Sequence, residues 1–109
     1  AGWVPSLLAR LDWVSEIWRK SEPDLRALQQ KPSEQIKDRI WFTPYPYEDV
    51  GALIRQSDSR LYMFSSDYPH VEGGRNPLGR FSASLTGMGD ADQSNFYADN
   101  FARLFSGHL

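Results

Sequence analysis

The sequence predicts a small α/β domain in which two short parallel strands are separated by a helix and flanked by further helices. Two apolar runs, over residues 39–43 and 61–65, support this class because both are rich in aromatic and branched side chains and both end in polar or proline-containing loops. Between them, Val50, Leu53 and Ile54 recur at helical spacing. Strands joined by a helix of this length pair in parallel through a right-handed crossover.

The first of the flanking helices is predicted over residues 4–18. Apolar side chains recur there at steps of three and four, and Pro5 stands near the start, where its missing N–H costs nothing. Trp13 falls off this apolar stripe, which indicates a second contact with protein outside the helix. The dipeptide Glu22-Pro23 interrupts the pattern.

Two short helices are predicted in the middle of the chain. The break at residues 31–34 precedes one of them, and Ser33 is a candidate N-cap for it. The other is predicted over residues 78–85, between the proline-rich loop and Gly87.

A last helix is predicted from Asp90 onward. Asp90 and Gln93 have the spacing of a capping box, and Ser106-Gly107 supplies a glycine at the end. Asn100 has poor helix propensity, so its amide is expected to bond to a loop.

Composition excludes several classes of protein. The 109 residues carry a formal net charge of −2 with no basic run, so the footprint of a nucleic-acid-binding protein is missing. There is no cysteine, hence no disulfide framework, and no apolar run approaches the length of a membrane span. These features predict a globular cytoplasmic protein that binds neither nucleic acid nor membrane.

Two parallel strands make a marginal sheet, and their open edges invite pairing with other strands. Residues 1–109 are therefore predicted to form a single partial domain, which either belongs to something larger or pairs with another copy of itself.

The stretch after the second predicted strand holds the best candidates for chemistry. The apolar run 61–65 ends in a polar, glycine-rich loop that carries Asp67, His70 and Arg75. Asp67 is a candidate catalytic residue, or the cap of a turn. His70 is a candidate partner of Asp67 or a packed loop residue, and Arg75 is a candidate clamp for a substrate carboxylate or a solvated cation beside Glu72.

The run at residues 64–70, with Glu72, Gly73, Gly74 and Arg75, resembles the last-strand motif of the amidohydrolase-related metal-dependent hydrolases, a family similar to aminocarboxymuconate-semialdehyde and resorcylate decarboxylases. Residues 2–5, 32–34, 40–43 and 95–105 are also similar to segments of that family. The resemblance implies the C-terminal part of a (β/α)8 TIM barrel, from helix 6 through strand 7, helix 7 and strand 8 to helix 8. Active sites of such barrels lie at the C-terminal ends of the strands.

The resemblance also implies an activity, namely hydrolysis or decarboxylation of a small carboxylated or carbonyl-containing substrate with a divalent metal such as zinc. Asp67 would bind the metal or its activated water, and His70 would support it. The family's other histidine ligands have no counterpart, because the only histidines are His70 and His108. The chain alone is therefore expected to be inactive and to need the rest of a barrel or another copy as partner.

Two functions of other classes remain open beside the enzyme segment. The chain could be a non-catalytic α/β module that self-associates by covering its strand edges. It could also be a domain that binds a small ligand at the 67–75 loop without metal.

Overall fold

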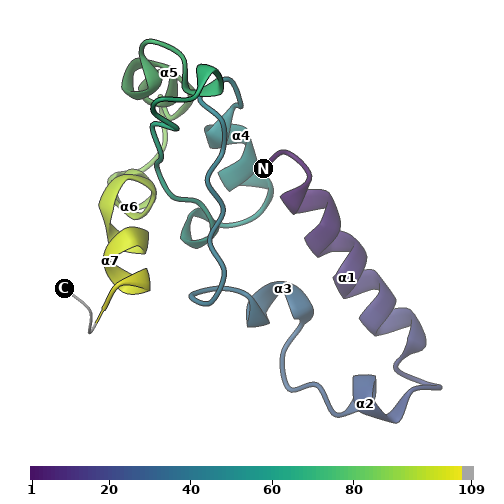
Figure 1. Cartoon of the computed structure of the whole chain (residues 1–109). Helices are drawn as coiled ribbons and strands as arrows, with labels where there is room; N and C mark the ends of the chain where they lie inside the picture. The colour runs from purple at the N-terminus through teal and green to yellow at the C-terminus, as the bar shows by residue number, and fades with distance from the viewer. Residues whose placement is uncertain (107–109) are drawn as a thin grey trace.

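The computed structural model describes residues 1–106. It consists of short helical elements connected by extended segments (Figure 1). In chain order they are α1 (Val4–Trp18), α2 (Pro23–Arg26), α3 (Pro32–Gln35), α4 (Val50–Gln56), the 3-10 turns η1 (Ser59–Leu61) and η2 (Val71–Gly73), α5 (Pro77–Ser84), α6 (Asp90–Ser94), the π-helical turn η3 (Asn95–Asp99) and α7 (Asn100–Leu104).

The predicted α/β class and the predicted segment of a (β/α)8 barrel are wrong. The chain is 56% helical and 2% strand, with no sheet among the residues that the structure describes. The two predicted strands meet at a single parallel bridge between Phe42 and Tyr62. Phe42 N donates to Leu61 O at 2.8 Å and Met63 N donates to Phe42 O at 2.9 Å, and the pairing stops there. The molecule is a small, mostly helical domain.

The pairing stops after the bridge because Pro44, two residues further on, has no N–H to donate. The opposite edge of the second extended segment is bonded to the C-terminal helical segment. There Tyr62 O accepts a hydrogen bond from the Asn100 side chain at 2.8 Å, and Phe64 N donates to Phe96 O at 2.8 Å. The C-terminal helical segment thus satisfies this edge in place of a neighbouring strand.

The predicted first helix is confirmed as α1, with Pro5 in its first turn. It buries only its N-terminal part, where Val4 and Leu8 join the core. Leu11, Val14 and the rest of the predicted apolar stripe stay exposed. The helices predicted over 48–56 and 78–85 are also present, as α4 and α5.

Two predicted caps are wrong. Ser33 does not cap α3, because its N–H and its hydroxyl both donate to the Asp12 carboxylate, at 2.9 and 2.7 Å. The last helix begins at Asp90 with Gly89 as its N-cap, so Asp90 is already helical, and Gln93 Nε2 donates instead to Met88 O at 2.9 Å. Gly107 lies outside the described residues.

The core lies where α4, α5, η1 and η3 meet the start of α1. Its buried apolar residues are Val4, Leu8, Val50, Leu53, Ile54, Leu61, Tyr62, Phe81, Leu85 and Phe96. Phe96 is central to it, with its ring 5.0 Å from Phe81, 5.1 Å from Tyr97 and 6.3 Å from Phe64 between centroids. This aromatic cluster joins α5 and η3 to the extended segment that leads to Asp67.

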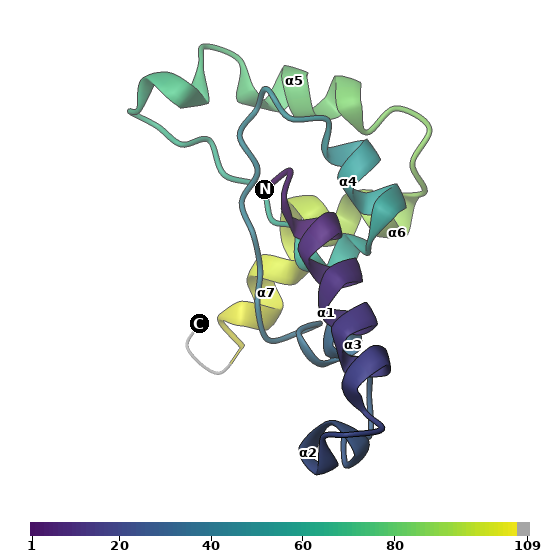
Figure 2. The same cartoon turned by 90° about the vertical axis from the view of Figure 1, so that its right-hand side faces the viewer.

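The molecule is elongated. Figures 1 and 2 both place α2 at one end and α5 at the opposite end, and α1 reaches along the molecule toward α2. The radius of gyration is 15.9 Å, compared with about 13 Å for a compact domain of this length. Although α3 packs against α1, the large apolar side chains of α1 beyond Leu8 stay exposed within residues 1–106.

Candidate functional site

Asp67 stands at the end of the extended segment that follows Tyr62, where the chain enters the loop before η2. Ser65 Oγ accepts a hydrogen bond from Asp67 N at 3.2 Å, and Ser66 Oγ accepts one from Tyr68 N at 3.3 Å. The φ angle of Asp67 is 55°, in the left-handed region that a residue other than glycine enters only at a local energetic cost. The two serines and this turn aim the carboxylate toward the loop.

The structure brings Asp67 and His70 together. His70 N donates to Asp67 O at 2.8 Å, which closes a turn that contains the cis Tyr68-Pro69 peptide bond. The imidazole Nδ1 then lies 3.1 Å from Asp67 Oδ1. The Asp67 side chain is 29% exposed and the His70 side chain 71% exposed, so the pair faces outward. With Nδ1 bonded to the carboxylate, Nε2 of the imidazole is the nitrogen left for a ligand or a proton.

Two glycines hold the loop that carries this pair. A side chain at Gly73 would run into Ser66 O, so only glycine lets η2 approach the Asp67 backbone this closely. Gly74 has a φ of 66° and lies against the Tyr47 hydroxyl. The Arg80 guanidinium stacks 4.2 Å from the centroid of the Tyr47 ring, which fixes that ring beside the loop.

Arg75 follows the loop and is exposed. Within residues 1–106 it forms no hydrogen bond or ion pair with Asp67, His70 or Glu72. The structure therefore joins two of the three sequence-predicted site residues directly and leaves the third beside them.

The donor set at Asp67 is too small for a catalytic metal. No group of three or more histidine, cysteine, aspartate or glutamate side chains that could hold a metal occurs among the described residues. Asp67 and His70 together offer one carboxylate and one imidazole, whereas a catalytic zinc has three protein ligands. The pair fits at most a part of a metal centre.

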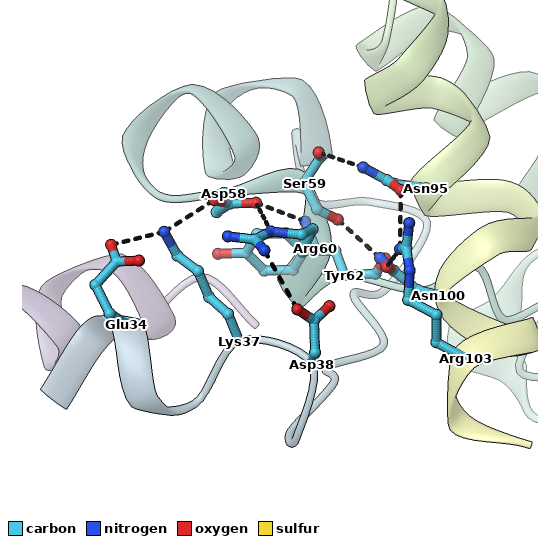
Figure 3. Close-up of polar contacts among 10 residues, drawn as sticks. All are labelled: Glu34, Lys37, Asp38, Asp58, Ser59, Arg60, Tyr62, Asn95, Asn100 and Arg103. Carbon is cyan, nitrogen blue, oxygen red and sulfur yellow. Dashed lines mark hydrogen bonds and ion pairs between the residues drawn. The ribbon is translucent and has the colours of Figure 1, made fainter. Parts of the chain in front are cut away.

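A second polar cluster, which sequence analysis missed, is centred on Asp58 (Figure 3). Asp58 accepts from Arg60 N at 2.9 Å and forms ion pairs with Lys37 at 3.0 Å and Arg60 at 3.4 Å. Lys37 also pairs with Glu34 and Arg60 with Asp38. Every charge in this cluster thus has a partner of opposite sign, and the ion pairs join the region of α3 to η1.

Asn100 is the buried centre of the same region and confirms the prediction that its amide bonds to a loop. Its Nδ2 donates to Ser59 O and to Tyr62 O, both at 2.8 Å, and its Oδ1 accepts from Arg103 at 2.7 Å. Figure 3 shows the amide between the η1 backbone and the C-terminal helix. The poor helix propensity of asparagine within a helix was the signal that pointed to this contact.

The Asp58 cluster predicts a pH dependence of stability. Burial acts to raise the pKa of Asp58, but hydrogen bonds from Arg60 N and from the Lys37 and Arg60 side chains outweigh it and hold this pKa below its ordinary value of 3.8. The charged cluster therefore stabilises the fold fully above pH 3.8, and this contribution is lost as the pH falls from there through the lowered pKa.

We expect Asp58→Asn to lower the free energy of unfolding by about 1–2 kcal/mol at pH 7, because the ion pairs with Lys37 and Arg60 are lost. The difference from wild type shrinks as the pH falls from 3.8 through the lowered pKa, where wild-type Asp58 becomes neutral as well. Denaturant unfolding at pH 7 and pH 3 measures both effects. Asp24→Asn, at an exposed position, is the matched control, and an unchanged difference at the two pH values would contradict the assignment.

Comparison of the chain with protein-family models, with curated proteins and with solved structures finds no match. Within the part of the chain that the structure describes, none of the helices combines the length and the apolarity that a bilayer crossing requires. The Asp67 loop and the exposed surfaces are therefore the features of the molecule that bear on its function.

Proposed function

We propose that the chain contributes Asp67 and His70 to the active site of a metal-dependent hydrolase or decarboxylase that acts in the cytoplasm on a small carboxylated or carbonyl-containing substrate. The observation that carries the proposal is the 3.1 Å contact between His70 Nδ1 and Asp67 Oδ1 in an outward-facing loop. A carboxylate that holds one imidazole nitrogen sets the tautomer of the ring and raises the basicity of the other nitrogen.

The backbone conformation of Asp67 supports the same proposal. A positive φ costs energy at a non-glycine residue, and such conformations cluster at functional sites, where the surrounding structure keeps them in place. Gly73 and the Ser65 hydroxyl hold the Asp67 backbone from two sides. The loop thus fixes the pair before any substrate arrives, which is what a catalytic group requires.

Each residue has a defined task in this proposal. Asp67 orients the ring, and His70 Nε2 accepts a proton or a metal. Arg75, next in the loop and free to move, receives the substrate carboxylate in bidentate fashion. A divalent metal would supply an activated water, but the remaining ligands have to come from protein beyond the described residues, so no catalytic step is derived through it.

A zinc titration followed by the ring resonances of His70 tests the proposal on the chain itself. We expect zinc to shift these resonances at His70, and Asp67→Asn to weaken the apparent affinity by about tenfold or more, since the partner of a ligating histidine has effects of this size. His108→Gln removes the other imidazole from the spectrum. Asp90→Asn is the control for loss of one exposed carboxylate.

Zinc that leaves His70 unshifted, or binds Asp67→Asn as tightly as wild type, would remove the pair from the proposed site. In any assembly that has the activity, Asp67→Ala should abolish turnover while the fold persists, because Asp67 is a surface residue of its loop. Release of carbon dioxide from aryl carboxylates and hydrolysis of small amides distinguish the two reactions.

A second function, self-association without catalysis, is favoured by the large exposed apolar surface. Among residues 1–106, sixteen large hydrophobic residues are exposed, and seven of them lie on α1 or directly before it: Trp3, Leu7, Leu11, Trp13, Val14, Ile17 and Trp18. Surfaces of this kind mark sites of protein contact. This function does not require the Asp67 loop, so variants of Asp67 leave it intact.

A further inference from the structure

The exposed surface of α1 contains a defined groove. Pro5, Ala9, Trp13 and Ile17 follow one another at steps of four and form a ridge, with Arg10 and Val14 beside it. They line an open groove of about 780 Å³. Trp13 is 66% exposed and Ile17 67% exposed, in a helix whose other face is anchored by Val4 and Leu8. We call this surface the α1 face.

The amount of exposed surface is what a dimer needs. The accessible surface of the chain is 7424 Å², whereas a compact monomer of 12.5 kDa exposes about 6,200 Å². If a dimer covered half of this excess surface area on each of its two copies, it would bury about 1,200 Å² in total. This area is the lower bound for specific interfaces. The most exposed apolar part of the chain outside the loops is the α1 face.

We infer that the α1 face binds the α1 face of a second copy, with the two helices antiparallel and Trp13 of each copy at the two-fold axis. This inference deepens the self-association proposed above by naming its surface and register. A two-fold dimer uses the same patch on both subunits, so the patch has to be complementary to itself.

The spacing of side chains along α1 meets this condition. In the register centred on Trp13, each Ala9 lies level with Ile17 of the second copy, so a small side chain is set against a large one. Antiparallel packing also opposes the two helix dipoles.

Sedimentation equilibrium of the full chain over a range of concentrations tests the inference. We expect a monomer–dimer equilibrium whose dissociation constant rises roughly 100-fold or more in Trp13→Glu, because a tryptophan at the centre of an interface is a typical hot spot. Leu78→Glu places the same charge on α5 at another exposed leucine, and it should leave the dimer unchanged.

A chain that is monomeric at all concentrations would overturn self-association altogether. A dimer that Trp13→Glu and Leu78→Glu weaken equally would overturn the α1 face while leaving self-association in place.

Discussion

Replacing Asn100 by alanine is expected to lower the free energy of unfolding by about 2–5 kcal/mol, because two carbonyls each lose a hydrogen bond in a buried site. Asn100 is fully buried, and its Nδ2 donates to both Ser59 O and Tyr62 O. The effect approaches the whole stability of a small domain, so the variant should unfold at a markedly lower denaturant concentration.

The matched control for this variant is Asn95→Ala. Asn95 contacts the same neighbours, Ser59 and Arg103, but it is half-buried and bonds to a hydroxyl rather than to a backbone carbonyl. We expect a loss of about 1 kcal/mol or less there, since water replaces the missing amide. Asn100→Asp separates hydrogen bonding from volume, because it has nearly the same shape but cannot donate to the two carbonyls. An Asn100→Asp protein as stable as wild type would refute the role of the donor.

Truncation of Phe96 to alanine is the second large effect, with an expected loss of about 3–5 kcal/mol. Phe96 is 1% exposed and contacts Phe64, Phe81 and Tyr97 at once. Alanine would leave a cavity that these rings cannot fill without leaving their own positions. Denaturant unfolding gives the energy, and the loss of the near-ultraviolet circular dichroism of the aromatic cluster reports the loosened packing.

Phe101→Ala provides the control on the same C-terminal segment. Phe101 is 51% exposed and its ring contacts only Phe105, at 4.6 Å, among the aromatic side chains in residues 1–106. We expect a change below about 1 kcal/mol. Equal losses at Phe96 and Phe101 would mean that helix propensity, rather than the aromatic core, determines the effect.

The substitutions at Asn100 and Phe96 both weaken the contact between the C-terminal helical segment and the second extended segment. Asn100 and Phe96 both belong to the C-terminal helical segment, and both bind the extended segment from Tyr62 to Phe64. That segment leads directly to Asp67. Weakening it should also increase the mobility of the Asp67 loop, so the zinc response of His70 is best measured in variants that keep this connection.

The α1 face and the Asp67 loop are suited to different kinds of partner. The α1 face is apolar, lies at some distance along the chain from Asp67 and needs another protein surface. The Asp67 loop is polar, held by short local contacts, and presents an imidazole to solvent. The chain thus combines a surface for protein contact with a loop for a small ligand, and separate variants test each of them.

The sequence by itself determined the local structure. The spacing of apolar residues located α1 and α4, the proline-rich loop and Gly87 located α5, and the unfavourable position of Asn100 predicted its contact with a loop. The contact between Asp67 and His70 was also predicted, because a carboxylate can orient a nearby imidazole. Such features depend on interactions between residues close together in the chain, which periodicity and propensity describe well.

Only the tertiary structure decided that no sheet forms. Residues 39–43 and 61–65 have the composition of buried strands, but a strand exists only when its backbone groups find another strand. Here Asn100 and the Phe96 carbonyl, more than thirty residues later, bond to one edge of the second segment, and Pro44 has no N–H to extend the pairing at the other edge. A pattern of side chains does not predict which distant group forms a hydrogen bond with a given backbone atom, because that depends on how the whole chain packs.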